Sequence, residues 1–352
     1  MLETSDSPRA TVAIVLVNWN GWRHVLECVD SLLAQTHSSA HIFVVDNDSS
    51  DHSVEHIGAW CAAPRREPTW AGLEGVGRFA GASPVAPVPC RIVERSDTAL
   101  PPPLAACRLT VIRAGSNRGF AAGCNIGIRA AGIDAYEFFW FLNTDAVAHR
   151  DALGALMRRA RQDARVGIVG STIRYYDRPA TIQVLGGARM DGAGVTRHIG
   201  EGLSLAAVPV DGTDIERQMA YVVGASMLVS ARFVREVGPM QEDYFLYGEE
   251  FDWALRGRDR FDFAYAPDSH VFHKSGASSS KVVHGFSTSL YYRNRIRLAA
   301  RFFPERLPAV HRTLVMELLR HALRGRWTYV RIIAAALRDA PSITRQVRPT
   351  PS

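Results

Sequence analysis

The feature that most constrains the fold is residues 11 to 17, TVAIVLV, an unbroken apolar and β-branched run. Such a run is typical of a strand that is buried on both faces of a parallel sheet. The next segment, WRHVLECVDSLLAQT, places its apolar residues at helical spacing, and a second buried strand, HIFVV, follows at 41 to 45. Strand, helix and strand in this order predict a right-handed βαβ unit.

The alternation continues with a strand at 108–113, a helix at about 120–131, a strand at 136–142 and a helix at about 150–163. Beyond these, VGIVGSTIRY, ATIQVLGG and AYVVGASMLVS predict strands of a more mixed sheet, and a short helix is expected near 231–237. The sequence therefore predicts an α/β fold with a mixed, mostly parallel central sheet flanked by helices.

Two regions stand apart from this pattern. Residues 62–107 are rich in Pro, Gly and Ala, so we interpret them as a surface insertion loop, with or without a function of its own. From His284 onward the sequence is helical in period. We therefore expect one α/β domain at 10–283 and a basic helical region at 284–340.

Charge is concentrated in that helical region. The chain has 41 Lys and Arg against 35 Asp and Glu, and thirteen Arg but three acids follow from residue 293 onward. With Phe302, Phe303, Trp327 and Tyr329, these helices suit either docking on the α/β domain or contact with an anionic inner membrane surface. An ordinary solvated basic face remains the alternative. No nucleic-acid partner is expected.

The compartment is predicted from cysteines and hydropathy. The five cysteines include no CxxC pair, so neither a disulfide framework nor a zinc site is indicated. The first apolar run lacks a preceding basic segment, and no stretch reaches about 18 uninterrupted apolar residues. We expect a cytoplasmic protein that is peripheral, at most, on the cytoplasmic face of the inner membrane.

Polar residues end several of the predicted strands. Asn18 follows the first strand, Asp46 the second, and Asn143 and Asp145 the strand YEFFWFL. In open α/β sheets ligands bind at the carboxyl ends of the strands, and Mg²⁺ is typically held by one or two carboxylates together with substrate phosphates. Asp145 is therefore a candidate metal ligand, although a turn or helix cap explains an Asp at this position equally well.

The segment GSNRGFAAGCNIG combines a glycine stripe with polar residues. Glycines four apart on a helix let a neighbouring element approach closely, and these are Gly115, Gly119, Gly123 and Gly127. Asn117, Arg118 and Asn125 are harder to assign to packing and could face a nucleotide. The sequence contains neither a dinucleotide fingerprint after a strand nor a P-loop.

The densest acidic cluster is YGEEFDWALR. Asp252 and Arg256 are four residues apart, which predicts a surface ion pair. Glu250 has no basic partner within a turn, so it is a candidate general base, with favourable placement at a helix N-terminus as the alternative. Downstream, His273 follows His270 at a spacing of three and is either a metal ligand or a hydrogen-bonded strand-end histidine.

Eight motifs in order resemble family 2 glycosyltransferases, the inverting enzymes with the GT-A fold, and their bacterial rhamnosyltransferase-like branch. They span roughly residues 11 to 300 and are VNWNG, VDNDSSD, SNRGFAAGCNIG, FLNTD, GASMLV, YGEEFDW, HVFHKSG and YYRNR. The resemblance implies a hexosyltransferase that moves a sugar, such as rhamnose, from a nucleotide-diphosphate sugar to a glycan or lipid-linked acceptor in cell-surface polysaccharide biosynthesis, with Mg²⁺ or Mn²⁺ as cofactor.

The resemblance also implies roles for individual residues. Asp145 would contact the metal, with Asn143 in place of the first Asp of the family's DxD, and His273 would lie near the metal and diphosphate. Glu250, where the family more often has Asp, would be the catalytic base, with Glu249 as the fallback. The implied nucleotide-sugar-binding residues are Asn18, Asp46, Asn117, Arg118, Gly119, Asn125, Asn143 and Asp145.

Two other classes of function remain open at this stage. A sugar-phosphate nucleotidyltransferase would use a similar nucleotide fold and metal, but it leaves YGEEFDW without a role. A noncatalytic nucleotide-sugar-binding protein would bind the donor and tolerate the loss of Glu250.

Overall fold

The structure is a computed structural model of the 352-residue chain. It describes residues 11–37, 39–64, 76–80, 87–101, 107–192, 194–208, 211–274 and 284–347.

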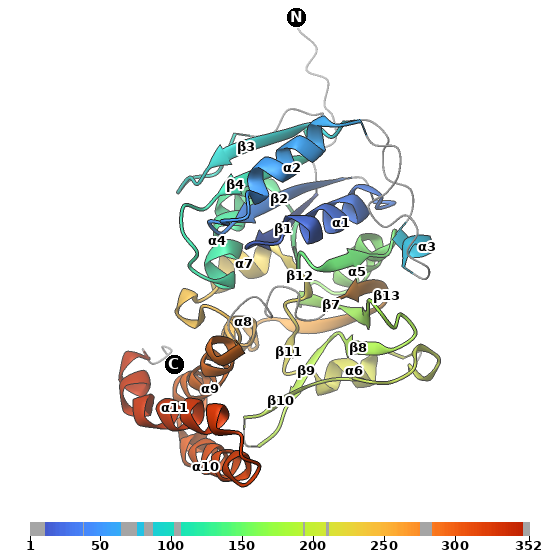
Figure 1. Ribbon diagram of the computed structural model, residues 1–352. Helices are drawn as coiled ribbons and strands as arrows, with labels where there is room; N and C mark the ends of the chain where they lie inside the picture. The colour runs from blue at the N-terminus through green and yellow to red at the C-terminus, as the bar shows by residue number, and fades with distance from the viewer. Residues whose placement is uncertain are drawn as a thin grey trace, which may run out of the picture.

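A large twisted sheet forms the centre of the molecule (Figure 1). Its strand order is β3-β4-β2-β1-β5-β12-β7-β13-β6, and β8 pairs with β7. The strands are β1 (Val12–Asn18), β2 (Ala40–Asp46), β3 (Cys90–Glu94), β4 (Leu109–Arg113), β5 (Phe138–Leu142), β6 (Ala146–Ala148), β7 (Val166–Tyr175), β8 (Ile182–Leu185), β12 (Ser226–Ser230) and β13 (Asp262–His273).

The sheet is mixed, as the sequence predicts. From β3 to β5 neighbouring strands are parallel, whereas β12 runs antiparallel to both β5 and β7. β13 is parallel to β7 and antiparallel to β6. A smaller sheet, in the order β10-β9-β11, consists of β9 (Gly187–Met190), β10 (Thr196–His198) and β11 (Tyr221–Val222).

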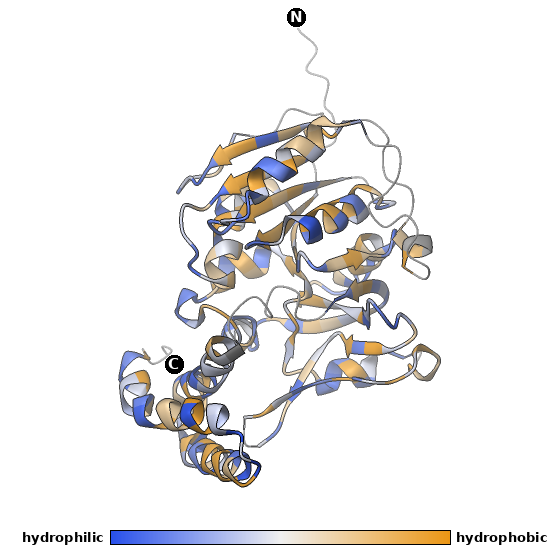
Figure 2. Cartoon of the chain, in the orientation of Figure 1, coloured by the Kyte–Doolittle hydropathy of each residue, from blue (hydrophilic) through white to orange (hydrophobic). Residues whose placement is uncertain are grey.

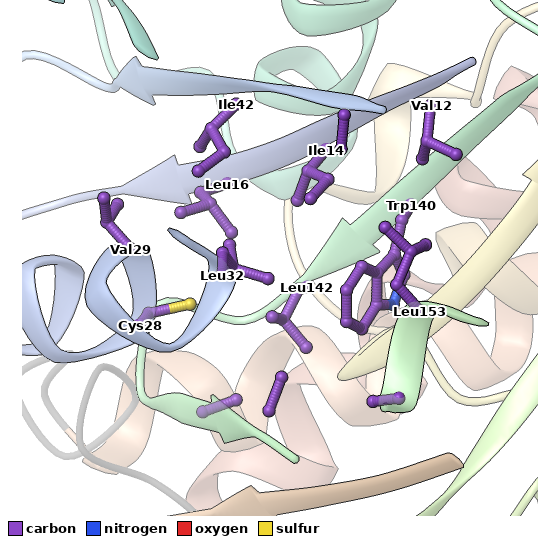
Figure 3. Close-up of a cluster of buried hydrophobic side chains, with 14 of the residues drawn as sticks. Val12, Ile14, Leu16, Cys28, Val29, Leu32, Ile42, Trp140, Leu142 and Leu153 are labelled. Atoms are coloured by element: carbon purple, nitrogen blue, oxygen red, sulfur yellow. The ribbon is translucent and has the colours of Figure 1, made fainter. Parts of the chain in front are cut away.

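Helices cover both faces of the central sheet. One face packs on α1 (Trp22–Leu33), α2 (Ser53–Ala62) and α5 (Ala152–Ala160), and the other on α4 (Phe120–Ala131), α7 (Ala231–Val237) and α8 (Glu249–Gly257). Alternate residues of β1 serve the two layers: Val12, Ile14 and Leu16 face α1 (Figure 3), and Ala13 and Val15 face α4. The unbroken apolar run is thus explained by burial on both sides.

The glycine stripe lets α4 lie close to β1. A Cβ atom on Gly123 would come within 2.5 Å of Val17 Cγ1, and one on Gly127 within 2.4 Å of Val15 Cγ1. These distances are shorter than van der Waals contact, so a side chain at either position would push the helix off the strand.

The region predicted as an insertion loop contains regular structure. β3 lies in it and pairs with β4 as the edge strand of the central sheet, and α3 (Gly77–Ala80) contributes the buried Ala80. The prediction of a loop between α2 and β4 is therefore wrong for these segments. Neither α6 (Thr213–Gln218) nor β13 is predicted from the sequence.

Three helices follow the sheet, as the periodicity predicts. They are α9 (His284–Phe302), α10 (Leu307–Leu323) and α11 (Trp327–Gln346), and they share an apolar core that includes Ile296, Leu314 and Ile333. Figure 1 shows them beside α8 and the smaller sheet. None of the described helices is both long enough and apolar enough to cross a bilayer.

The close approach of α4 to β1 gives a test of the packing. Gly127→Ala would raise helix propensity, which alone stabilises by roughly 0.5–1 kcal/mol. We expect the opposite sign, a loss of about 1–3 kcal/mol, because the added methyl meets the rigid Val15. Urea unfolding measures the change, and Gly192→Ala, where a Cβ atom would meet nothing within 4 Å, is the control. A stabilised Gly127→Ala variant would contradict the packing described here.

Candidate active site

A cavity of about 450 Å³ lies between the ends of the central strands, the smaller sheet, α8 and α9. We call it the central cavity. Its polar lining includes Asn143, Glu249, Glu250 and His273, so residues from β5, α8 and β13, far apart in the sequence, meet around one space. The apolar lining is largely aromatic and comprises Phe120, Tyr221, Phe251, Tyr291 and Phe303 among others.

One wall of the central cavity is built where β5 ends. Asn143 follows β5 directly, and Asp145 precedes β6, which pairs with the end of β13 so that His273 lies opposite Ala146. This pairing brings His273 Nε2 within 3.1 Å of Asp145 Oδ1 and 3.2 Å of Asn143 Nδ2. Two of the strand-end residues predicted from sequence, Asn143 and Asp145, therefore form one cluster with His273.

The Asp145 carboxylate is held in its ionised form. Burial by itself raises the pKa of this group, but the hydrogen bond and the charge of His273 oppose burial, and the pKa of Asp145 ends below its ordinary value. An anionic oxygen is thus fixed beside the central cavity.

The orientation of His273 suits a cation. Its Nδ1 lies 3.0 Å from Gln183 Oε1, and when Nδ1 donates this hydrogen bond the neutral ring presents the Nε2 lone pair to Asp145. With a proton on Nε2 this contact is an ordinary hydrogen bond of 3.1 Å, and without that proton the imidazole and the carboxylate would offer a divalent cation two ligands.

Asp145 and His273 would supply only part of a metal shell. Within the described residues there is no group of three or more His, Cys, Asp or Glu side chains arranged to hold a metal ion. A site with one carboxylate and one imidazole is incomplete by itself. In such a site Mg²⁺ would take its remaining ligands from water and substrate phosphates, as it usually does in proteins.

The opposite wall carries two glutamates at the start of α8. Glu249 is buried, with 2% of its surface exposed, whereas Glu250 keeps some exposure. In each side chain Oε2 is covered and has no hydrogen-bond partner among the described residues. A buried carboxyl oxygen without a partner is costly, so each has a strong tendency to hold a proton or bind a donor.

The two carboxyls differ in what surrounds them. Burial, and then the neighbouring charge of Glu250, raise the pKa of Glu249 well above its ordinary value. Burial also raises the pKa of Glu250, but the backbone N–H groups of Glu250, Gly248 and Gly224 oppose that rise. The geometry thus favours a protonated Glu249 beside a Glu250 that ionises more easily.

The segment before these glutamates has an uncommon backbone. Phe245, Tyr247 and Gly248 have positive φ angles of 60°, 70° and 101°. For residues other than glycine such angles are strained, by roughly 1–3 kcal/mol each, and persist only where surrounding contacts impose them.

Asn294 of α9 holds this segment. Its side chain is buried, and Nδ2 lies 2.9, 2.9 and 2.8 Å from the carbonyl oxygens of Tyr244, Leu246 and Tyr247. The motif YYRNR does not reveal this role, because the Nδ2 of Asn294 binds only backbone carbonyls, and such contacts leave no mark in composition or charge.

Asp252 provides a second link between α8 and α9. The sequence predicts a surface ion pair with Arg256, and the pair exists at 2.8 Å, but Asp252 is completely buried. It also accepts from Arg301 of α9 at 2.5 Å and from the Tyr244 hydroxyl at 2.9 Å. The prediction that Asp252 lies at the surface is therefore wrong. Its buried carboxylate instead joins α8 to α9 of the C-terminal helices.

Asp46 lies at a different cavity of about 240 Å³, which Asp48, Ser49 and Arg113 also line. Its carboxylate accepts from Asn18 Nδ2 at 2.7 Å, from Ser49 Oγ at 2.6 Å and from Ser49 N at 3.0 Å. Asp46 and Asn18 thus shape the turn after β2 at the strand edge, apart from the residues that line the central cavity.

The polar residues around the start of α4 have protein partners. Asn117 Oδ1 accepts from the Gly119 N–H at 3.0 Å, and Arg118 forms an ion pair with Glu242 at 3.0 Å. Asn125 is buried and bonds the backbone of Met240 in both directions. In this structure Asn125 therefore joins α4 to the segment before α8 and lines neither cavity.

Gly119 is required by a close contact. A Cβ atom there would lie 2.2 Å from the carbonyl oxygen of Phe245, and φ is +91°. The same carbonyl accepts from Phe120 N at 2.8 Å. The motif SNRGF is thus placed directly against the strained segment that leads to Glu249.

Residues 13–68 and 100–195 match the family described as Glycosyl transferase family 2. The matched segments contain the predicted strand-end residues, whereas Glu250 and His273 lie beyond them. No match was found among curated proteins.

Two solved structures resemble the fold. One is the mannosyltransferase PcManGT from Pyrobaculum calidifontis in complex with GDP-Man and Mn²⁺, with 14% sequence identity, a TM-score of 0.50, and coverage of 97% of this chain and 88% of that one. The other is TarS residues 1–349 from S. aureus, with 10% identity, a TM-score of 0.48, and coverage of 94% and 91%. The first likeness, together with the sheet described above, identifies the fold as the GT-A type that the sequence resemblance implies.

The protonated Glu249 gives a test through pH-dependent stability. A carboxyl whose pKa is raised in the folded state holds a proton that the unfolded chain releases, so the wild type loses stability as the pH rises above the ordinary glutamate range. Glu249→Gln has no such loss, and near pH 7 its melting temperature should exceed the wild-type value by about 2–6 °C. The difference should shrink towards pH 5 in thermal melts, and Glu305→Gln, at an exposed carboxyl, is the control. A constant difference across this range would contradict the assignment.

The hydrogen bonds of the Asn294 side chain give a second test. Asn294→Ala removes the amide donor that the carbonyl oxygens of Tyr244, Leu246 and Tyr247 share, and it should lower the free energy of unfolding by about 2–4 kcal/mol. Asn294→Asp keeps the size but replaces the donor with an acceptor, so it should cost at least as much in urea unfolding. Wild-type stability in the Asp variant would show that the amide donor is unimportant.

Proposed function

We propose that this chain is an inverting glycosyltransferase that moves a sugar from a nucleotide-diphosphate sugar to an acceptor hydroxyl in one displacement. The observation that carries the proposal is the central cavity, which has Asn143 and His273 on one wall and Glu250 on the other. Asp145, which we propose holds a metal, contacts the lining residue His273, and Glu250, which we propose as the base, lies on the opposite wall. The family match and the GT-A fold support the same class of reaction.

In this proposal Asp145 and His273 bind the diphosphate end of the donor. Held by these two residues, a divalent ion such as Mg²⁺ or Mn²⁺ would neutralise negative charge on the leaving diphosphate. The solved mannosyltransferase of similar fold contains GDP-Man and Mn²⁺, which supports a donor and a metal of these classes here. Asp46 and Asn18, at the edge of the sheet near β2, are proposed to contact the nucleoside.

Glu250 is the better candidate for the base. A general base takes the proton of the acceptor hydroxyl as that oxygen attacks the anomeric carbon, so the carboxyl must be ionised before the step and needs a pKa within reach of neutral pH. The three backbone N–H groups that oppose the rise of the Glu250 pKa favour this form, whereas burial and the charge of Glu250 keep Glu249 protonated. Attack from the face opposite the leaving group inverts the anomeric centre.

The lining of the central cavity bears on the acceptor. Tyr221 and Phe251 stack with ring centroids 4.7 Å apart, and Tyr291, Leu298 and Phe303 extend this apolar surface along α9 and beyond it. Aromatic faces suit sugar rings and apolar chains alike. We therefore propose a glycan or lipid-linked acceptor in cell-surface polysaccharide biosynthesis, with rhamnose as the first sugar to test because the motifs resemble that branch.

The direct experiment follows nucleoside diphosphate release. Purified protein is incubated with a panel of nucleotide sugars and Mn²⁺ or Mg²⁺, with and without candidate acceptors, and donors are first ranked by thermal shift because ligands that bind the native state raise its apparent stability. Release that depends on both donor and acceptor supports the proposal. Release of pyrophosphate from a sugar phosphate and a nucleoside triphosphate would instead identify a nucleotidyltransferase.

Glu250→Gln tests the base directly. Turnover should fall by about 10²–10⁴-fold, because positioned proton transfer contributes about that factor. The thermal shift caused by the donor should stay close to that of the wild type, since the amide keeps the shape of the cavity. Glu305→Gln should retain full activity. A loss confined to Glu249→Gln would reassign the base, and unchanged turnover in both glutamine variants would refute the proposed mechanism.

A further inference from the structure

Helix α10 exposes a row of apolar residues to solvent. Val315, Leu319 and Leu323 follow one another at four-residue spacing, and Met316 lies beside them. At 3.6 residues per turn these side chains lie on one face of the helix. Leu323 is 90% exposed, and Trp327, at the start of α11, is 62% exposed. We call Val315, Met316, Leu319, Leu323 and Trp327 the apolar ridge.

The ridge faces away from the protein. Val310 and Leu314 of the same helix are buried in the core shared by α9, α10 and α11, and they lie on the opposite side of α10. Figure 2 shows hydrophobic and hydrophilic residues interleaved along α10 at the lower edge of the molecule. Folding of the described residues therefore leaves this apolar face uncovered, although contiguous exposed apolar surface usually marks an interaction site.

Positive charge surrounds the ridge. Arg312, Arg320, Arg324, Arg326 and Arg331 are all exposed, and none forms an ion pair with a carboxylate of the described residues. Residues 307–338 contain a single acid, Glu317, which turns inward to pair with Arg295 of α9 at 2.9 Å. The surface around the ridge is thus basic, and no acidic side chain of residues 307–338 neutralises these arginines.

We propose that the apolar ridge and its arginines bind the surface of an anionic lipid bilayer. A helix with apolar residues on one face and arginines alongside lies in the interface of such a bilayer, where the apolar side chains enter the acyl boundary and the guanidinium groups contact anionic headgroups. A second copy of the chain fits less well, because a two-fold contact through the ridge would bring two sets of unpaired arginines together.

Binding in this way would also orient the central cavity. Arg306 and Val310, at the start of α10, line that cavity, and the ridge continues along the same helix to Leu323. Thirteen residues separate Val310 from Leu323, which corresponds to about 20 Å of helix. The cavity would therefore lie near the bilayer surface. The proposal does not depend on sugar transfer, since lipid binding is measured without donor or acceptor.

Vesicle sedimentation of the full chain tests the proposal. Vesicles of phosphatidylcholine with about one third phosphatidylglycerol should bind the protein, vesicles of phosphatidylcholine alone should bind it at least about tenfold more weakly, and salt should weaken the binding. Equal binding to both kinds of vesicle, or to neither, would overturn the proposal.

Paired substitutions locate the binding surface. Arg320→Gln with Arg324→Gln should lower the partition coefficient by about 30-fold, because each arginine near an anionic surface contributes about 1 kcal/mol. Leu319→Ser with Leu323→Ser should lower it by at least about tenfold. Arg158→Gln with Arg161→Gln removes the same charge from α5 and its C-terminal end and should have little effect.

Thermal melts and light scattering complete the design. All the substituted side chains are exposed, so each variant should melt within a few degrees of the wild type. If the control pair lowers vesicle binding as much as the ridge pairs do, net charge alone is responsible and the ridge is not the site. If the leucine pair turns a dimer into a monomer while vesicle binding is unchanged, the ridge is an interface between copies and the proposal fails.

Discussion

The amide of Asn294 is the contact on which the geometry of the central cavity depends. Backbone carbonyls that are buried need donors, and the Asn294 amide donates to a group of three, the carbonyl oxygens of Tyr244, Leu246 and Tyr247. Because these residues lead directly into Glu249, the position of both glutamates is set by a helix that follows them by some forty positions in the chain. The C-terminal helices thus belong to the construction of the site, and the Asp252 to Arg301 pair binds the same two parts together.

The two walls of the central cavity impose opposite protonation on buried carboxyls. At the strand ends, His273 more than offsets the effect of burial and keeps Asp145 anionic. At the start of α8, Glu249 has a carboxylate as its neighbour and burial raises its pKa. Carboxyls whose surroundings drive their pKa values apart are what acid–base and metal-assisted chemistry require within one site. Here the two pKa values differ because Asp145 lies at the strand ends beside His273, whereas Glu249 lies at the start of α8 beside Glu250.

The sequence predicts those parts of the structure that depend on local pattern. The buried runs of β1, β2 and β5, the helices from His284 onward and the close packing of Gly123 and Gly127 on β1 are confirmed, whereas Gly115 lies before α4 and its Cβ position would meet nothing within 4 Å. β3 was missed because CRIVE is short and half exposed, as an edge strand is, and it lies among prolines. β13 was missed because Pro267 and Asp268 interrupt its pattern where the pairing with β7 shifts register. The burial of Asp252 and the roles of Asn125 and Asn294 depend on partners 47 or more residues away, in positions that only tertiary structure supplies.

The short strand β3 gives the Pro-rich region a structural role at the edge of the central sheet. β3 pairs with β4 along its whole length, and its own outer edge is only five residues long and carries Arg91 and Glu94. Without it, the backbone N–H and C=O groups of the thoroughly buried β4 would border solvent and offer a template for pairing with another molecule. A shortened chain in which α2 ran directly into β4 would therefore keep its chemistry-bearing residues but lose its protection against aggregation.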